Sequence, residues 1–310
     1  MLDELATAIT RHGGDMWSDT AVPRMRLVAL DEPATPVGPA PPVDLLYEPM
    51  VCFIVDGSKD SVAGDRSWSA GRGEIFFNSL VLPVTATFKE VPYRSAVLRL
   101  DGRMLADLLL ELEGPDPRTL PGPEPGGLVT TPITPELADA VTRWVRLLDT
   151  PDDIRPLAAR IEGEILYRLL NSPLGPTLRH FTLADSAAAR IRAAARWICA
   201  HYNEPLRIEE LAAAAHMSTA TLHRHFKTAT GMSPLRFQKH LRLQEARRRL
   251  VAGDTTAALV AEEIGYVSAT QFNREYRRAY GLPPGQDAAR LRGRLADVGV
   301  GVGGGGRGRG

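Results

Sequence analysis

Two stretches of sequence decide the fold: residues 208–237, IEELAAAAHMSTATLHRHFKTATGMSPLRF, and residues 260–286, VAEEIGYVSATQFNREYRRAYGLPPGQ. The second stretch repeats the pattern of the first at an offset of 50 residues, which indicates two copies of one structural unit. The matching residues are Met217 and Val267, Ser218 and Ser268, Leu222 and Phe272, Arg224 and Arg274, Phe226 and Tyr276, Gly231 and Gly281, and Pro234 and Pro284.

Each copy predicts a short helix, a turn and a second helix. Ser218 and Ser268 are expected N-caps, whose hydroxyls accept hydrogen bonds from free amides at a helix start. Gly231 and Gly281 stand where a left-handed C-cap is needed. Small alanines in the first helix allow close approach of the second, whose packing residues are expected to be Met217, Leu222 and Phe226 in one copy and Val267, Phe272 and Tyr276 in the other. The opposite face is short and polar, and such a face suits the major groove of DNA.

The two stretches, joined by a helix predicted over 234–252, resemble the double helix-turn-helix domain of the AraC/XylS family. The resemblance covers residues 188–290 and is strongest in IGYVSATQFNREY, residues 264–276. It implies a sequence-specific transcription regulator that binds double-stranded DNA. It favours an activator over a repressor, and an activator would have RNA polymerase as a partner. It also implies that the two second helices enter successive major-groove segments about 34 Å apart.

The resemblance also assigns contacts to individual residues of the two second helices. It implies base contacts from Ala220, His223, Arg224, Thr270, Asn273 and Arg274. Arginine pairs with guanine and asparagine with adenine, each worth about 1–3 kcal/mol of discrimination. Ala220 departs from the bulkier residues common at its position, so a thymine methyl is the contact it could make. Phosphate contacts that set the register are implied for Ser218, Lys227, Ser268 and Arg277.

The charge of the chain is divided between its halves. Residues 1–185 contain 17 Lys and Arg against 27 Asp and Glu, a net charge of −10, whereas residues 186–310 contain 20 against 10, a net charge of +10. A basic C-terminal half favours a polyanionic partner. The first residues, MLDELATAIT, lack the pattern of a signal peptide, and no apolar run is long enough to span a bilayer. We therefore expect a cytoplasmic protein that makes no membrane contact.

The N-terminal half predicts a small all-β domain with flanking helices. Short segments rich in Val, Ile, Phe and Leu are separated by Gly and Pro, and they cover 45–55, 61–68, 74–82, 84–89 and 94–100. With WSAGRGEIFFN at 68–78, this pattern resembles the cupin-like sensor barrel of one AraC subgroup. Helices are expected over 1–12, 101–113, 134–149 and 152–171, and an exposed loop over 114–127.

The expected fold class is therefore α+β, with the chain divided into four parts. A cupin-like β-barrel with flanking helices would occupy residues 1–172 and bind an effector. A linker over 173–187 would lead to the all-α domain of two helix-turn-helix units at 188–290. The glycine-rich sequence near the end predicts a disordered tail over 291–310.

An apolar pocket for a small-molecule effector is the function expected of the barrel. Its candidate lining residues, each of which could instead be plain core, are Cys52, Phe53, Val55, Trp68, Phe76 and Leu98. Cys52 is either an inert buried thiol or a sensor of an electrophile. Enzymatic cupins hold a metal through barrel histidines, but no histidine lies between residues 43 and 100. We therefore expect no metal, no cofactor and no enzyme activity.

Two other functions stay open at this point. One is a cupin-type metalloenzyme fused to a DNA-binding module, and the other is an adaptor whose helical domain binds protein. An apolar stripe on the helices at 134–171 would either form a homodimer contact or cover the barrel, and its members are Trp144, Leu148, Ile161 and Leu169. The resemblance favours an effector-controlled regulator that forms a homodimer.

Overall fold

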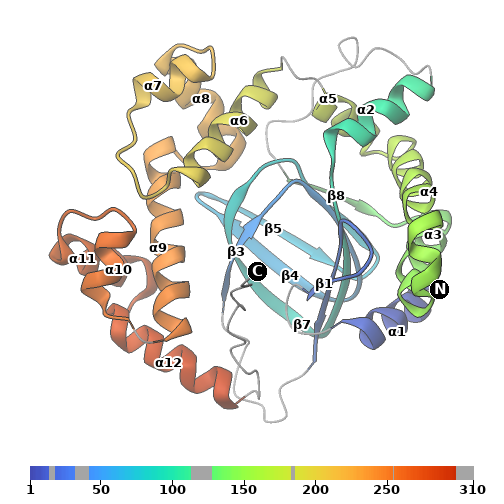
Figure 1. The fold of residues 1–310 in the computed structure, drawn as a ribbon, viewed down its shortest axis with the longest axis horizontal. Coiled ribbons are helices and arrows are strands. Elements are labelled where there is room, and N and C mark those ends of the chain that lie inside the picture. The colour runs from blue at the N-terminus through green and yellow to red at the C-terminus, as the bar shows by residue number, and fades with distance from the viewer. Residues whose placement is uncertain (14–17, 32–41, 113–127, 183–185, 254, 298–310) are drawn as a thin grey trace, which may run out of the picture.

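The chain forms an antiparallel sheet that lies between two groups of helices (Figure 1). This computed structural model describes residues 1–13, 18–31, 42–112, 128–182, 186–253 and 255–297. The sheet has the strand order β1-β2-β7-β4-β6-β8, with β3 paired to β7 and β5 paired to β4. The strands are β1 (Ser18–Asp19), β2 (Met25–Leu30), β3 (Val43–Tyr47), β4 (Met50–Ala63), β5 (Arg66–Gly71), β6 (Glu74–Asn78), β7 (Leu82–Arg99) and β8 (Leu128–Pro132). The expected α+β class is confirmed.

The sheet curls until one of its faces is enclosed. Strands β4 and β7 are long, and their pairing shifts register between Ile54 and Lys59, where Gly57 has a φ of 67°. Such bulges bend a strand and increase its twist. As a result, the rings of Tyr47 on β3 and Phe76 on β6 lie 5.5 Å apart although these strands do not pair. We call the enclosed side, which carries Tyr47, Cys52, Lys59, Phe76 and Tyr93, the inner face.

The sequence prediction divided the sheet into shorter strands than the structure has. The predicted strands at 84–89 and 94–100 are parts of β7, and β1, β2 and β8 were not predicted. Pro92 was expected to end a strand, yet it lies inside β7 and has no registered partner on β2 or β4. A missing N–H costs no sheet hydrogen bond at such a position, so the strand continues through it. The predicted loop at 114–127 lies outside the described residues.

The outer face of the sheet is covered by α1 (Leu2–His12), α3 (Pro135–Arg146) and α4 (Pro151–Leu170). A short 3-10 turn, η2 (Leu147–Asp149), joins α3 to α4, and α2 (Gly102–Glu111) and α5 (Gly175–Thr182) lie beside them. Trp144 and Leu169 of the predicted stripe are fully buried in this cluster, and Leu148 and Ile161 are partly buried against it. The stripe therefore covers the sheet of its own chain.

The C-terminal half is helical throughout its described residues (Figure 1). The helices are α6 (Ala187–Ala200), α7 (Ile208–Ala214), α8 (Thr219–Thr230), α9 (Pro234–Ala252), α10 (Ala257–Glu263), α11 (Ala269–Tyr280) and α12 (Pro284–Asp297). Helix α5 lies within the predicted linker, and α12 extends to Asp297, into the stretch that was predicted to be a disordered tail. Residues 298–310 lie outside the described residues. Among the helices that the structure describes, none combines the length and apolar character of a membrane span.

A single hydrophobic core joins the inner face of the sheet to the first helix-turn-helix unit. It includes Ile54, Phe76 and Val97 from the sheet and Leu222 and Phe226 from α8. The β4–β5 turn also touches the turn between α8 and α9, where a Cβ on Gly231 would lie 2.7 Å from the Ala63 carbonyl oxygen. The two halves of the chain are therefore in close contact at this point.

This contact predicts that equivalent glycines of the two units differ in their tolerance of alanine. Gly231 and Gly281 end α8 and α11 with φ values of 72° and 79°. Gly281→Ala should cost about 1–2 kcal/mol of unfolding free energy, the strain of a left-handed alanine, because nothing lies within 4 Å of the added methyl group. Gly231→Ala should cost more, since it must also displace the β4–β5 turn. Denaturant unfolding of both variants measures the difference, and equal losses would contradict the contact.

Candidate nucleic-acid interface

Helices α8 and α11 begin and end as the sequence predicts. The hydroxyl of Ser218 accepts a hydrogen bond from the Thr221 amide at 3.2 Å, and that of Ser268 accepts one from the Gln271 amide at 3.3 Å. Both N-cap predictions are confirmed, as are the left-handed caps at Gly231 and Gly281. The two helices thus have the same length and the predicted offset of 50 residues.

The turn before α11 differs in one detail from the repeat that the sequence predicts. Val267 was expected to pack like Met217, but it is fully exposed, and Tyr266 is buried in the core of the second unit. The amides of Met217 and Tyr266 donate to the equivalent carbonyls of Ala212 and Ala261. The first helices are therefore related by 49 residues and the second helices by 50, because the second turn contains one extra residue.

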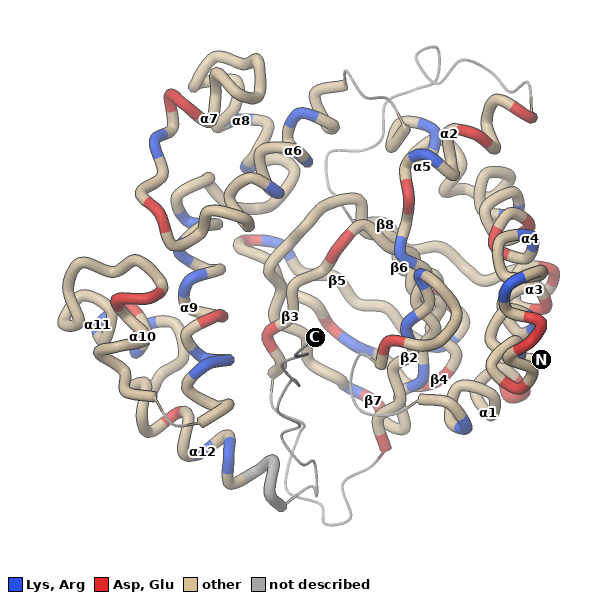
Figure 2. The backbone as a smooth tube through the Cα atoms, in the orientation of Figure 1, with Lys and Arg blue, Asp and Glu red and all other residues tan. Residues whose placement is uncertain are grey.

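The ten residues predicted to contact DNA are all exposed. They are the base-contact candidates Ala220, His223, Arg224, Thr270, Asn273 and Arg274 and the phosphate-contact candidates Ser218, Lys227, Ser268 and Arg277. Within the described residues, the four basic members of this set form no ion pair with a carboxylate. Their charges are therefore available to an external anion. Figure 2 shows Lys and Arg along α9, whereas α3 and α4 carry Asp and Glu together with Arg.

Arg242 on α9 fixes the two units relative to each other. Its guanidinium donates to the carbonyl oxygens of Tyr202 at 2.6 Å, Glu204 at 2.8 Å and Gly265 at 2.9 Å. The first two acceptors follow α6 and the third is in the turn of the second unit. The approach is so close that a Cβ on Gly265 would lie 2.0 Å from the Asn203 carbonyl oxygen. The sequence analysis missed Arg242, because one arginine among several in a helix indicates a solvated face.

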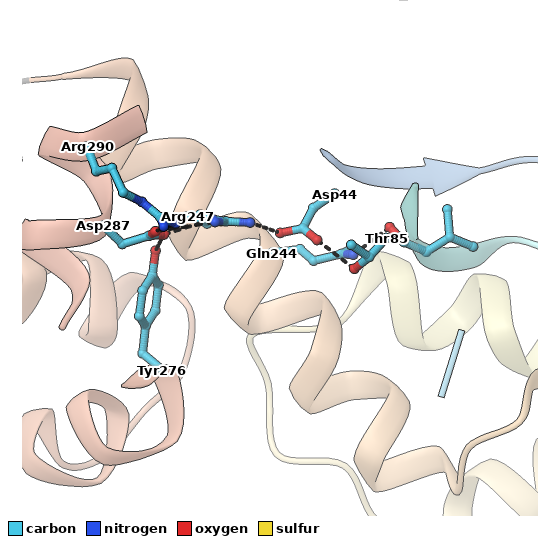
Figure 3. A network of polar contacts seen from close by, with 8 residues as sticks. Asp44, Thr85, Gln244, Arg247, Tyr276, Asp287 and Arg290 are labelled. Carbon is cyan, nitrogen blue, oxygen red and sulfur yellow. Dashed lines mark hydrogen bonds and ion pairs between the residues drawn. The ribbon is translucent and has the colours of Figure 1, made fainter. Parts of the chain in front are cut away.

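A second arginine of α9 connects the helical half to the sheet (Figure 3). Arg247 lies 3.0 Å from an Asp44 carboxylate oxygen on β3 and 2.8 Å from an Asp287 oxygen on α12. Asp287 also accepts a hydrogen bond from the Tyr276 hydroxyl of α11 at 3.1 Å. Burial alone would raise the pKa of Asp287, but the hydrogen bonds from Arg247 and Tyr276 lower it. The network therefore joins β3, α9 and α12 through ionised groups, and α11 through the neutral hydroxyl of Tyr276.

The predicted effector-pocket residues do not line one cavity. Cys52 and Phe76 lie on the inner face, and the half-buried Trp68 packs against them. Phe53, Val55 and Leu98 instead pack outward against the helices of the outer face. Successive side chains of a strand point to opposite faces, so Cys52 and Phe53 cannot line the same pocket. The prediction missed Lys59, which is buried on the inner face. Alternation along VCFIVDGSK could not have found it, because strict alternation from Cys52 places Lys59 on the outer face and only the register shifts between Ile54 and Lys59 turn it inward.

Two helix-turn-helix units on one shared helix, behind a domain built on a curled sheet, define a class of DNA-binding regulator. The family model described as the AraC-type transcriptional regulator N-terminus matches residues 21–177, and a helix-turn-helix domain model matches residues 211–290. The chain belongs to the AraC-type transcriptional regulators.

Curated relatives match part of the chain. The transcriptional activator RhaS of Pectobacterium carotovorum is 34% identical over 94 residues, which cover 30% of this chain and 34% of RhaS. The transcriptional regulator MtrA of Neisseria gonorrhoeae is 39% identical over 79 residues, 26% of each chain. The matches thus span about a third or less of these relatives. ToxT of Vibrio cholerae, solved with a bound unsaturated fatty acid, has a TM-score of 0.55 at 11% identity and covers 85% of this chain and 94% of that one. That likeness shows the fold.

The Arg247 network predicts that Asp44 contributes more to stability than a surface carboxylate. Asp44→Ala removes the partner of a half-desolvated guanidinium and should cost about 1–3 kcal/mol of unfolding free energy. Asp19→Ala is the matched control, because Asp19 pairs with Arg26 at 2.6 Å while 76% of its side chain is exposed. An exposed pair is worth about 1 kcal/mol or less. Thermal and denaturant unfolding compare the variants, and a loss no larger for Asp44→Ala would refute this role.

Proposed function

We propose that this chain is a transcription activator that binds a specific double-stranded DNA sequence through α8 and α11 and is controlled by a small-molecule effector in its N-terminal domain. The observation that carries the proposal is the pair of capped helices with exposed polar faces, held together by part-buried hydrogen bonds from Arg242. Membership of the AraC-type family supports a regulator rather than an enzyme.

The assignment of contacts follows from the exposed faces of the two helices. Arg224, Asn273 and Arg274 would read base edges, because arginine and asparagine form paired hydrogen bonds with guanine and adenine. Ala220, His223 and Thr270 would complete the base contacts. Phosphates would be bound by Ser218, Lys227, Ser268 and Arg277. Each serine would donate a hydrogen bond to the phosphate, because its hydroxyl oxygen already accepts the capping hydrogen bond.

Activation and effector binding are supported by relatives rather than by a site in this chain. RhaS is named an activator, and ToxT was solved with an unsaturated fatty acid. An activator would also contact RNA polymerase. An effector can change DNA binding only if it favours one arrangement of the two halves over another. The Gly231 contact and the Arg247 network are the connections through which such a preference would act.

A homodimer remains a prediction, and it would need a surface other than the predicted stripe. Trp144 and Leu169 are fully buried within their own chain. Helix α4 leaves Leu157 and Tyr167 exposed, and these residues would be the first candidates for such a contact. Cytoplasmic localisation also remains a prediction, in keeping with a partner that is DNA.

Selection of bound fragments from genomic DNA tests the proposed function directly. The full-length chain should enrich one sequence motif, and its affinity should fall steeply as salt rises, because lysine and arginine release counterions from the phosphates they bind. Enrichment of no motif at low salt would refute sequence-specific binding. Loss of transcription from a promoter carrying the selected site, on deletion of the gene, would distinguish an activator from a repressor.

Two arginines one turn apart on α11 provide a test of the contact assignments. Arg274→Ala should weaken binding to the selected site by about 1–3 kcal/mol and relax specificity at one position. Arg277→Ala, the matched control, should weaken binding to all sequences alike and reduce the salt dependence by about one charge. Titrations on the selected site and on single-base variants separate the two patterns. A uniform loss for Arg274→Ala would make it a phosphate contact instead.

A further inference from the structure

The inner face of the sheet contains a buried lysine without a carboxylate partner. Lys59 on β4 is 4% exposed. Its Nζ atom lies 4.0 Å from the Cys52 sulfur and between 5.0 and 5.6 Å from the ring centres of Phe76, Tyr47 and Tyr93. Among the described residues, no carboxylate lies within ion-pair distance of this atom. The nearest groups are thus three aromatic rings and a thiol.

The ammonium group of Lys59 is removed from water and pairs with no carboxylate of the described residues. Removal of a charge from water costs several kcal/mol unless an opposite charge compensates for it. Aromatic faces return about 0.5–2 kcal/mol of that cost. Burial alone would lower the pKa of Lys59, but Cys52, Tyr47 and Tyr93 raise it by more, so the net shift is upward. The side chain therefore stays positively charged, with a thiol and two phenol side chains beside it in place of a carboxylate.

Further polar groups meet the same face in an otherwise apolar surrounding. The Ser95 hydroxyl oxygen is fully buried and has no partner at hydrogen-bond geometry. Ser95 lies on the same side of β7 as Tyr93, whose hydroxyl is 3.9 Å from the Cys52 sulfur. A few convergent polar groups within an apolar lining are typical of a small-molecule site.

We propose that the inner face binds a small organic carboxylate, with the carboxylate group at Lys59 Nζ and the apolar body against the rings of Tyr47, Phe76 and Tyr93. The hydroxyls of Ser95 and Tyr93 supply hydrogen-bond donors in the same cluster. A monoanion balances the single ammonium, whereas a phosphate dianion would bring more negative charge than this site neutralises. The identification of this carboxylate as the effector rests on the proposed function.

Strand β3 connects this site to the helical half. It carries Tyr47, whose ring meets Lys59, and three residues earlier Asp44, which pairs with Arg247 of α9. A ligand that displaces the Tyr47 ring must shift β3 or the rotamer of Tyr47. A shift of β3 would move Asp44 relative to Arg247, and the network in Figure 3 continues from there to α11 and α12.

The first test measures ligand binding to the full-length chain by thermal shift. The probes are octanoate and benzoate, each compared with its own alcohol, 1-octanol or benzyl alcohol. At least one carboxylate should raise the melting temperature more than its alcohol does. Lys59→Met should weaken that binding ~10–100-fold, the loss of one charge-assisted contact. Lys89→Met is the matched control, because Lys89 lies on the same sheet with 55% of its side chain exposed, and it should bind as the parent does.

The second test needs no ligand. Methionine has nearly the length of lysine without its charge, so Lys59→Met should still unfold in one cooperative thermal transition, as Lys89→Met should. Loss of the folded state in Lys59→Met, with Lys89→Met still folded, would make Lys59 a structural residue and overturn the proposal. The proposal would also be overturned if neither carboxylate raised the melting temperature more than its own alcohol does. Carboxylate binding by a chain that selects no DNA sequence would support the site while refuting the proposed function.

Discussion

The arrangement of the helical half depends on guanidinium groups that are partly removed from water. A buried guanidinium must find acceptors for its five N–H groups, since unpaired polar groups are costly in the interior. The acceptors of Arg242 and Arg247 lie on segments outside α9. Arg242 donates to three backbone carbonyl oxygens around the two units. Arg247 pairs with two carboxylates. Rotation of either unit about α9 would break several of these hydrogen bonds together. A shared helix alone would hold the units at a distance but would not fix their rotation.

The helical units could be predicted from the sequence because their determinants are local. An N-cap serine, a C-cap glycine and an apolar stripe lie within a dozen residues of one another, and each acts through its own backbone neighbours. Ser218 and Gly231 therefore gave the ends of α8 without any knowledge of the rest of the chain. The extra residue at Val267 escaped notice because the caps on its C-terminal side match at an offset of 50, and a turn tolerates an insertion that a helix does not.

The sheet and the candidate ligand site were less accessible, because they depend on contacts between distant segments. The curl of β4 and β7 arises from a register shift that no single strand encodes. The grouping of Lys59 with Tyr47 and Phe76 exists only once strands that do not pair face each other across the curl. Arg247 likewise has no special status in a run of three arginines until β3 and α12 bring Asp44 and Asp287 to it. The charges were visible in the sequence, whereas their burial was not.

The extra residue in the turn of the second unit makes the two helix-turn-helix units unequal. The turn that leads into α11 is one residue longer than the turn that leads into α8, and the solvent-exposed Val267 lies in this longer turn. The two units therefore differ in the surface beside their second helix. The two ends of a bound DNA site would then meet unlike surfaces. A regulator built in this way would recognise an asymmetric operator. It would bind every copy of that operator in the same orientation relative to the gene.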